Sequence, residues 1–410
     1  MGKIYIRTYA YNAERTLPRA IKSVLEQTHG DFIYYLCDNG STDGTRAIVE
    51  DYARLDSRIR PFYNSVNRAY METEECLLLP YNIEDSDYYC TLDADDEYQP
   101  TFFADMLQFM QENNLDIAAC GSDFMDVAEN NKLVGQRILP LNMVLYDRTF
   151  SDYFAYYHVF MRAFWGKLYK GFTLRDTVQD TSQISDFPTA YGGDTYNTLL
   201  AFKSAKRVGI LSKSLHKYYI SNKSVSYQFH PGRVKSDRIL HEATLDYLRY
   251  HNAITPKNED FLFVVYLNAL RDTTDVLLNA ENSDLEKINY LYEMLTCSYT
   301  AQLAAREEFG ASISEAEKRQ RMRHDLFSGI ARWLLQIYDV PDDLLADYCF
   351  MGEFCCAAAN FAEGWISFKK LHIRCLVNEK NIIEAKKEFD NIEEFLQDDP
   401  ELNSIKSLLN

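Results

Sequence analysis

The sequence runs Tyr88-Tyr89-Cys90-Thr91-Leu92-Asp93-Ala94-Asp95-Asp96, an apolar segment that passes directly into a group of acidic residues. Aromatic and β-branched residues that end in a turn-forming cluster are typical of a buried strand. A loop that follows such a strand lies at the carboxyl edge of the sheet, where open α/β sheets bind their ligands. The stretch therefore predicts an α/β fold with a polar site just beyond this strand.

Strands and helices alternate through the first hundred residues. Short apolar runs predict strands, and apolar residues three or four apart predict the helices between them. We expect strands at residues 4–6, 32–37, 59–63 and 88–92, a helix that opens at Asn12, and a second helix over 46–54. This alternation is typical of a mostly parallel, doubly wound sheet with helices on both faces.

The remainder of the chain is predicted to be helical. Long helical windows occur at residues 239–249, 260–278, 284–309, 313–338 and 383–396. Pro231-Gly232 marks the expected boundary, so we predict an α/β domain at 1–232 and an acidic all-helical domain at 233–410. Its last part, 350–410, loosely resembles tetratricopeptide hairpins, but it has no clean 34-residue period, so an irregular helical bundle is the favoured interpretation.

The composition is that of a folded globular protein. The chain has 410 residues, 47% of them apolar, and its net charge of −18 argues against binding to nucleic acid or anionic membranes. Nine scattered cysteines without a C-x-x-C pair disfavour disulfides and a zinc site, and favour a reducing compartment. No apolar run approaches the roughly 20 residues of a membrane span. We therefore expect a cytoplasmic protein without a membrane span.

The acidic residues after Leu92 suit a hard divalent cation. Carboxylate oxygens at a sheet edge are ligands for Mg²⁺ or Mn²⁺, and a cation offsets the repulsion among Asp93, Asp95 and Asp96. A merely solvated acidic loop is the alternative, and it is our interpretation of the nearby residues 84–87. The position directly after a strand favours the metal site.

Four motifs follow one another through the α/β region. They are Tyr11-Asn12-Ala13-Glu14-Arg15-Thr16-Leu17, Ser23-Val24-Leu25-Glu26-Gln27-Thr28, Asp38-Asn39-Gly40-Ser41-Thr42-Asp43-Gly44-Thr45 and Leu92-Asp93-Ala94-Asp95-Asp96-Glu97-Tyr98. In this order and spacing they resemble the motifs of family 2 glycosyltransferases with the GT-A fold. The resemblance covers roughly the first 230 residues, because it continues less closely through Trp165-Gly166-Lys167-Leu168-Tyr169, Gly193-Asp194-Thr195-Tyr196 and 215–226.

The resemblance implies inverting transfer of a sugar from a nucleotide-diphospho-sugar, usually a UDP-sugar, to an acceptor hydroxyl. It places nucleotide-sugar contacts at Ala10, Tyr11, Asn12, Glu14, Asp38, Asn39, Asp93 and Ala94. Two positions depart from the family, since Ala10 replaces a common Thr and Asn39 replaces an Asp that accepts the uracil N3–H. The amide oxygen of Asn39 can still accept that bond, so UDP remains the expected nucleotide. Support of the turn at Gly40 is the alternative role for Asn39.

The resemblance also assigns the charged roles at the diphosphate. Asp95 is the expected metal ligand, assisted by Asp93 or Asp96, with Mn²⁺ or Mg²⁺ bridging both phosphates. In the family, a loop closes over the diphosphate, and residues 215–226 correspond to it in this chain. Ile220 stands where family members commonly have a basic residue, so Lys217 or Lys223 would take over that role. His216 in the same stretch is alternatively a packed histidine.

Two further roles carry over from the family pattern. Asp194 is the expected general base, since the family's Glu-Asp pair reads Gly193-Asp194 in this chain. Capping of a helix over 195–202 is the alternative. Trp165 is a candidate acceptor platform because the C–H faces of sugars stack on flat rings, and packing in the core is its alternative.

These features favour a non-processive enzyme. Processive synthases add membrane helices and a Gln-x-x-Arg-Trp motif, whereas Arg332-Trp333 is preceded by Gly329 here. The resemblance suggests a hexose of glucose or galactose type and a glycan, glycolipid or glycoprotein acceptor in bacterial surface glycan or glycoprotein biosynthesis. The helical region would bind the acceptor, a partner enzyme or a second copy of the chain.

Two other functions compete with this hypothesis. A binding scaffold with a decayed catalytic site is favoured by Ala10, Asn39 and Gly193. The retained acids Asp93, Asp95, Asp96 and Asp194 argue against it. A nucleotidyltransferase is the weaker alternative, because residues 7–14 contain no glycine for a triphosphate-binding loop.

Overall fold

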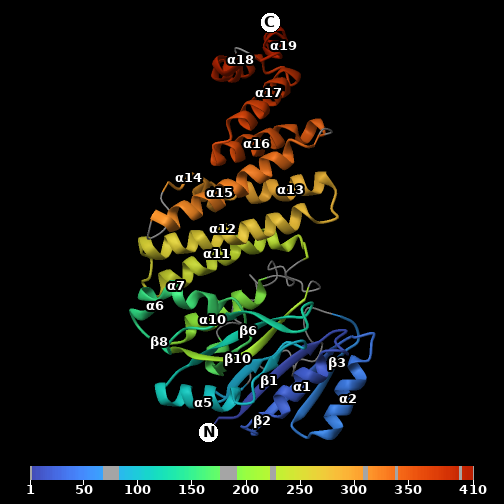
Figure 1. Cartoon of the computed structure of the whole chain (residues 1–410), viewed down its shortest axis with the longest axis vertical. Coiled ribbons are helices and arrows are strands. Elements are labelled where there is room, and N and C mark those ends of the chain that lie inside the picture. The colour runs from blue at the N-terminus through green and yellow to red at the C-terminus, as the bar shows by residue number, and fades with distance from the viewer. Residues whose placement is uncertain are drawn as a thin grey trace. The chain divides into compact units, whose positions relative to one another are not determined.

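The computed structural model describes residues 2–67, 83–175, 192–221, 228–307, 313–337, 340–396 and 399–409 (Figure 1). The chain divides into two compact units, Met1–Asn258 and Glu259–Asn410. The first contains one ten-stranded sheet with its helices, and the described part of the second is helical. No helix in these ranges is long and apolar enough to cross a membrane. The cysteines in these ranges are free thiols.

The first half of the sheet is parallel, in the order β3-β2-β1-β4. Its strands are β1 (Ile4–Ala10), β2 (Phe32–Asn39), β3 (Ile59–Asn64) and β4 (Tyr88–Thr91). Helix α1 (Leu17–Leu25) lies between β1 and β2 in the sequence, and α2 (Thr45–Leu55) lies between β2 and β3. The four expected strands are confirmed, because buried parallel strands read as continuous apolar runs.

The second half of the sheet is mixed. Its strands are β5 (Glu97–Tyr98), β6 (Ile117–Asp126), β7 (Lys132–Arg137), β8 (Met143–Leu145), β9 (Lys167–Lys170) and β10 (Val208–Ile220). Strands β6 and β10 are parallel, whereas β9 runs antiparallel to β4 and β6, and β5, β7 and β8 pair antiparallel. The expected mostly parallel sheet is thus corrected to a mixed one, because β7 returns beside β6 as a hairpin without a crossover helix.

The main core of the first unit lies between the sheet and helices α1, α2 and α5 (Phe102–Asn113). Ile21 of α1 and Met106 of α5 are fully buried there with Ile6 of β1. Apolar residues recur on one side of each helix, so burying that side fixes the helix on the sheet. The loops at the strand ends are therefore carried by a packed scaffold.

The other helices of the first unit are short except for α11. They are α6 (Thr149–Asp152), α7 (Phe154–Tyr157), the 3-10 helix η1 (His158–Met161), α8 (Phe172–Arg175), α10 (Gly193–Ser204) and α11 (Gly232–Tyr250). The hydroxyls of Tyr157 in α7 and Tyr247 in α11 are hydrogen-bonded at 3.0 Å, and both residues are buried. Helix α11 consequently belongs to the first compact unit, which ends after Asn258. The division at 232/233 stays a prediction for the extent of the two domains.

The second unit contains α12 (Pro256–Leu278), α13 (Asp284–Leu295), α14 (Ser298–Ala305), α15 (Ile313–Leu334), η3 (Asp342–Leu344), α16 (Leu345–Ala359), α17 (Ala362–Asn378), α18 (Ile382–Ile392), η4 (Glu393–Leu396) and α19 (Leu402–Leu408). Helices α15 to α18 each pack against the next in sequence. The helical character expected here is confirmed. The single window expected over 284–309 is two helices, because Cys297 is extended with φ −62° and ψ 132°.

The contact between α16 and α17 yields a stability prediction. A Cβ added at Gly352 would lie 2.2 Å from Cδ1 of the buried Phe368 ring, so Gly352→Ala is expected to destabilise the helical unit by about 1–3 kcal/mol. Gly329→Ala is a matched control, since its Cβ meets nothing within 4 Å and alanine favours the helix by about 0.5–1 kcal/mol. Thermal unfolding followed by circular dichroism measures both. Equal melting curves for the two variants would contradict the packing described.

A second stability prediction concerns His372 of α17. Its Nδ1 lies 2.9 Å from Oε1 of Glu353, and this hydrogen bond raises the pKa of the imidazole above 6.5. A raised histidine pKa stabilises the fold fully below the unfolded value, and this contribution is lost as the pH rises through the folded value. The melting temperature is expected to fall between pH 6 and pH 8.5, by the equivalent of about 0.5 kcal/mol. His372→Gln should flatten that part of the curve, and an unchanged slope would contradict the assignment.

Candidate active site

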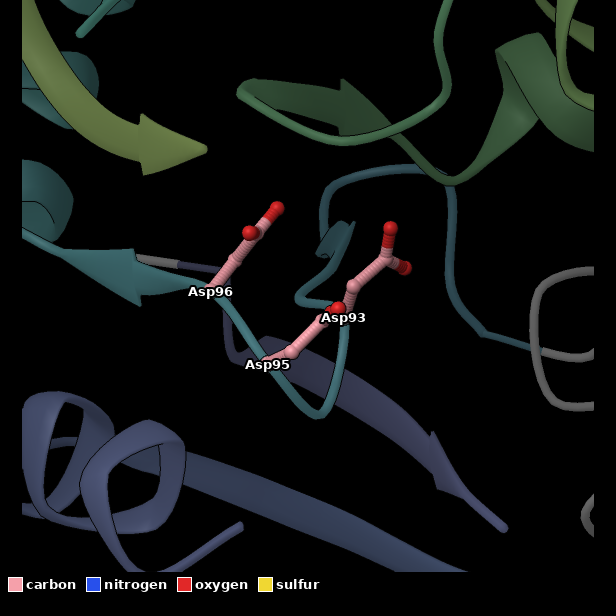
Figure 2. Close-up of side chains that lie close together, drawn as sticks. All are labelled: Asp93, Asp95 and Asp96. Carbon is pink, nitrogen blue, oxygen red and sulfur yellow. The ribbon is translucent and has the colours of Figure 1, made fainter. Parts of the chain in front are cut away.

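The loop between β4 and β5 brings three carboxylates together. One ligand oxygen from each of Asp93, Asp95 and Asp96 lies within 4.8 Å of the other two. Figure 2 shows the side chains of Asp93 and Asp96 projecting to the same side of this loop. Asp93 is exposed, Asp95 is half-buried and Asp96 is buried. The loop thus presents oxygen ligands that differ in their exposure to solvent. They lie at the carboxyl end of a parallel strand, as the sequence predicts.

Asp96 is fixed by β10. Its Oδ1 accepts a hydrogen bond of 2.9 Å from the backbone N–H of Tyr219. Its Oδ2 lies 3.1 Å from Nε2 of His216, but the pair is not aligned as a hydrogen bond. Burial lowers the pKa of His216 to about 3, so the ring is neutral at physiological pH and forms no ion pair. One oxygen of Asp96 is therefore left without a hydrogen-bond donor among the described residues.

Asp93 and Asp194 lie close enough to interact electrostatically. Desolvation raises the pKa of Asp93 well above its usual range, and the charges of Asp96, Asp194 and Asp95 add to the effect. Desolvation also raises the pKa of Asp194. Both side chains reach solvent, so their desolvation reflects protein atoms that surround them on the other sides. These carboxylates come from the loop after β4 and from α10, which are far apart in the sequence.

Asp194 is not a helix cap. Helix α10 begins at Gly193, and its N-cap is Gly192 with a left-handed φ of 86°. Asp194 lies in the first turn, two residues after the N-cap, so its alternative role as the N-cap residue is wrong. A carboxylate in this turn is favoured by the helix dipole and keeps its oxygens for a ligand. Its role as a general base stays a prediction.

Two cations face Asp194. The charges of Lys167 and Arg7 both lower the pKa of Asp194, opposing the effect of burial. Lys167 on β9 is buried, and its Nζ donates to the carbonyls of Ala163 and Trp165. Burial and the neighbouring Arg137 lower the pKa of the Lys167 ammonium to about 7. Arg7 was not among the site residues expected from the sequence. A charged residue within the otherwise apolar run of β1 is nevertheless a signal for a functional side chain, because such residues are rarely buried without a partner.

The loops after β1 and β2 hold each other in place. Oδ1 of Asn12 accepts the N–H of Thr42 at 2.8 Å, and Oε2 of Glu14 accepts the N–H of Gly44 at 2.8 Å. The side chains of Asn12 and Glu14 are thus engaged in loop structure. Of the other expected nucleotide contacts, Ala10 is buried at the end of β1, Tyr11 is exposed and Ala94 lies within the acidic loop.

Asp38 and Asn39 differ in whether their side-chain oxygens are free to accept a hydrogen bond from a ligand. Asp38 is fully buried, and its Oδ1 accepts the N–H of Ser41 at 3.2 Å. Its Oδ2 has no hydrogen-bond partner in the described part of the chain. The Asn39 amide accepts from Asn64 at 2.6 Å and donates to Asn67 at 2.9 Å. Asn39 is therefore bound to Asn64 at the end of β3 and to Asn67 beyond it, and its support of the turn at Gly40 stays a prediction, while Asp38 presents the unmatched acceptor.

The remaining expected site residues are placed as follows. Lys217 pairs with Glu97 on the neighbouring strand β5, with Nζ 3.2 Å from Oε2. Lys223 lies outside the described residues. Trp165 is 9% exposed, and its ring stacks on His216 at 4.3 Å between centroids. His216 is thus a packed histidine, and its contact with Trp165 leaves little of the tryptophan surface for a sugar. The ligand roles of these residues stay predictions.

Comparison with known proteins identifies the region that contains the carboxylate loop after β4. Residues 6–172 match the family described as glycosyl transferase family 2. The chain is 26% identical over 210 residues to an uncharacterised glycosyltransferase, EpsJ, of Bacillus subtilis, covering 51% of this chain and 58% of EpsJ. It is 28% identical over 135 residues to WfgD of Escherichia coli, named as a UDP-Glc:alpha-D-GlcNAc-diphosphoundecaprenol beta-1,3-glucosyltransferase, covering 32% of this chain and 49% of WfgD.

A solved structure is similar over a longer range. The crystal structure of S. aureus TarS 1-349 in complex with UDP-GlcNAc covers 91% of this chain and 92% of that chain, at 15% identity and a TM-score of 0.45. The chain spans about half the length of the curated relatives it matches. Over residues 6–172 the chain thus matches glycosyl transferase family 2, and the expected α/β GT-A fold followed by a helical region is confirmed.

Proposed function

We propose that this chain is a metal-dependent, inverting, non-processive glycosyltransferase that moves a hexose of glucose or galactose type from a UDP-sugar to an acceptor hydroxyl. The observation that carries the proposal is the group of carboxylates formed by Asp93, Asp95 and Asp96, together with the electrostatic interaction between Asp93 and Asp194. Sugar transfer needs a cation-binding group at the leaving diphosphate and a carboxylate base at the acceptor. The family match and the UDP-Glc specificity named for WfgD support this choice of reaction and donor.

The carboxylates fit a hard cation such as Mn²⁺ or Mg²⁺. All the ligand atoms are oxygens, their spacing suits a shared ion, and Oδ2 of Asp96 has no donor among the described residues. Asp93 and Asp95 are the more accessible of the three, so we assign them the direct contacts and Asp96 a positioning role. When bound, the cation would neutralise the charge that develops on the leaving diphosphate.

The donor nucleotide would lie against the interlocked loops after β1 and β2. The unmatched Oδ2 of Asp38 is an acceptor suited to a base N–H, and we prefer it to the engaged amide of Asn39 for that contact. The exposed ring of Tyr11 offers a face for the uracil. Lys217 and Lys223 remain candidates for diphosphate contacts. UDP is the proposed nucleotide on this basis.

Asp194 would accept the proton of the attacking hydroxyl. An inverting reaction needs the acceptor on the face of the sugar opposite the leaving group, with a base within hydrogen-bond reach. The charges of Arg7 and Lys167 oppose the rise in the Asp194 pKa that desolvation causes, and so favour the carboxylate form that accepts a proton. The acceptor would be a glycan, glycolipid or glycoprotein of a bacterial surface, and we place the reaction in the cytoplasm. The helical unit would bind the acceptor, a partner enzyme or a second copy.

Release of free nucleotide from a panel of UDP-, GDP-, CMP- and dTDP-sugars tests the proposal. The assay is run with Mn²⁺, with Mg²⁺ and with excess EDTA. We expect turnover of a UDP-hexose that EDTA abolishes and Mn²⁺ restores. Absence of metal-dependent turnover and of binding for every donor would contradict the proposal and favour the decayed binding scaffold.

A further inference from the structure

A cavity with an arginine in its wall is formed by β6, by β7 with the residues that follow it, and by η1. Its volume is about 380 Å³, and its lining includes Phe124 of β6, Arg137 of β7 and Phe160 of η1. None of the residues that line it is acidic. An apolar cavity with one convergent charged group is typical of a ligand-binding site.

Arg137 is the charged group of this cavity. Its guanidinium lies 5.5 Å from the ring centroid of Phe124 and 5.3 Å from that of Trp165. It forms no ion pair with any residue that the structure describes. Burial and the charge of Arg162 lower its pKa to about 10, so it remains a cation at neutral pH. The strands thus hold a partly desolvated positive charge against two aromatic rings.

Arg162 adds a second positive charge. It directly follows η1, whose residues Val159 and Phe160 line the cavity, and its side chain is exposed. Within the described ranges it also has no ion pair. Two neighbouring guanidinium groups repel each other unless an anion lies between or beside them. The chain has a net charge of −18, so two arginines that form no ion pair with a described carboxylate are unusual in it.

The carboxylate of Asp123 on β6 is hydrogen-bonded to other residues. Asp123 accepts hydrogen bonds from Gln136 at 2.7 Å and from Ser214 at 2.6 Å. Side chains alternate along a strand, so Asp123 lies on the opposite face of β6 from Phe124. The protein therefore does not use this acid to neutralise Arg137.

The cavity is connected to the candidate active site through side-chain contacts. The Trp165 ring that Arg137 approaches also stacks on His216, whose Nε2 is 3.1 Å from Oδ2 of Asp96. Lys167 interacts electrostatically with both Arg137 and Asp194. A ligand held in the cavity would thus be linked to the candidate active site through Trp165, His216 and Lys167.

We propose that this cavity is an acceptor subsite that binds a phosphate-type anionic group of the acceptor through Arg137 and Arg162, an inference that rests on the proposed function. Guanidinium groups match the oxygens of phosphate with paired hydrogen bonds. Two of them fit a phosphate, which carries more charge and more oxygens than a single carboxylate. Phe124 and Phe160 would contact the apolar parts of the same acceptor.

Calorimetric titration of the full chain tests this subsite. UDP and Mn²⁺ are present at saturation to fill the donor site, and the probes are glucose 1-phosphate, glucuronate and glucose. We expect glucose 1-phosphate to bind most tightly and its affinity to fall as sodium chloride rises from 50 to 300 mM. Arg137→Gln and Arg162→Gln should each weaken it about tenfold or more. Arg148→Gln, at an exposed arginine of α6's N-terminus, should bind as wild type.

The outcomes separate this inference from the proposed function. Equal affinity for glucose 1-phosphate and glucose, tighter binding of glucuronate, or wild-type affinity in both arginine variants would overturn the subsite. Arg162→Gln keeps the test decisive if Arg137→Gln does not fold, because Arg162 is exposed. Donor hydrolysis is measured on the same wild-type preparation. Probe binding that depends on the two arginines, without hydrolysis of any donor, would support the anion cavity and contradict the transferase.

Discussion

Replacing Asp194 with Asn is expected to lower the rate of sugar transfer by about 10²- to 10⁴-fold, the range that a positioned general base contributes. The amide keeps the size of the side chain but cannot take the proton of the acceptor hydroxyl. The measurement is UDP release in the presence of acceptor, with kcat and KM separated. The KM for the donor should change little, because the base acts on the acceptor.

The pH dependence of the transfer rate is a second measurement for this variant. Its pKa is raised by desolvation, so wild-type activity should fall as the pH falls through that raised value, and rise above it. Asp194→Asn should lose this limb of the pH profile. Asp152→Asn, at an exposed acid of α6, is the matched control and should behave as wild type. A transfer rate within threefold of wild type for Asp194→Asn would remove the residue from the mechanism.

Replacing Asp95 with Ala is expected to lower metal-dependent donor turnover by at least about 100-fold. A hard cation held by fewer carboxylates binds more weakly, and the leaving diphosphate is then less well neutralised. Nucleotide release from the UDP-sugar at increasing Mn²⁺ measures the effect. Asp93→Ala should give the same result, because both side chains are accessible in the loop (Figure 2).

The acidic stretch before β4 provides the control for the metal site. Asp85 is an exposed acid that pairs with Arg175 at 2.7 Å. Asp85→Ala should therefore retain full Mn²⁺-dependent turnover. If Asp95→Ala kept its response to Mn²⁺ while Asp85→Ala lost it, the assignment of the metal ligands would be reversed.

The parallel strands could be predicted because their signals are local. The run Phe32-Ile33-Tyr34-Tyr35-Leu36-Cys37 is apolar on both faces and leads into a Gly/Asp loop, and it forms β2. By contrast, β7 is a largely exposed strand, so it lacks the continuous apolar run that marks a buried strand in a sequence. The start of α1 was placed too early because Asn12 adopts a left-handed φ of 48°, which delays the helix to Leu17.

The site could be predicted only where its residues lie in one motif. Asp93, Asp95 and Asp96 are consecutive apart from Ala94, so the sequence alone places them at one sheet edge. Arg7 and Lys167 reach Asp194 from β1 and β9, and that proximity depends on the mixed sheet order. The engagement of Asn39 with Asn64 likewise depends on the register between β2 and β3.

Binding of Mn²⁺ to the full chain, followed by electron paramagnetic resonance with and without UDP, tests the central claim most directly. The account predicts one bound Mn²⁺ whose affinity increases when UDP is present, since the nucleotide phosphates complete its coordination. Asp95→Ala should lose this ion and Asp85→Ala should keep it. Wild-type protein that binds no Mn²⁺ at millimolar concentration with saturating UDP would contradict the account.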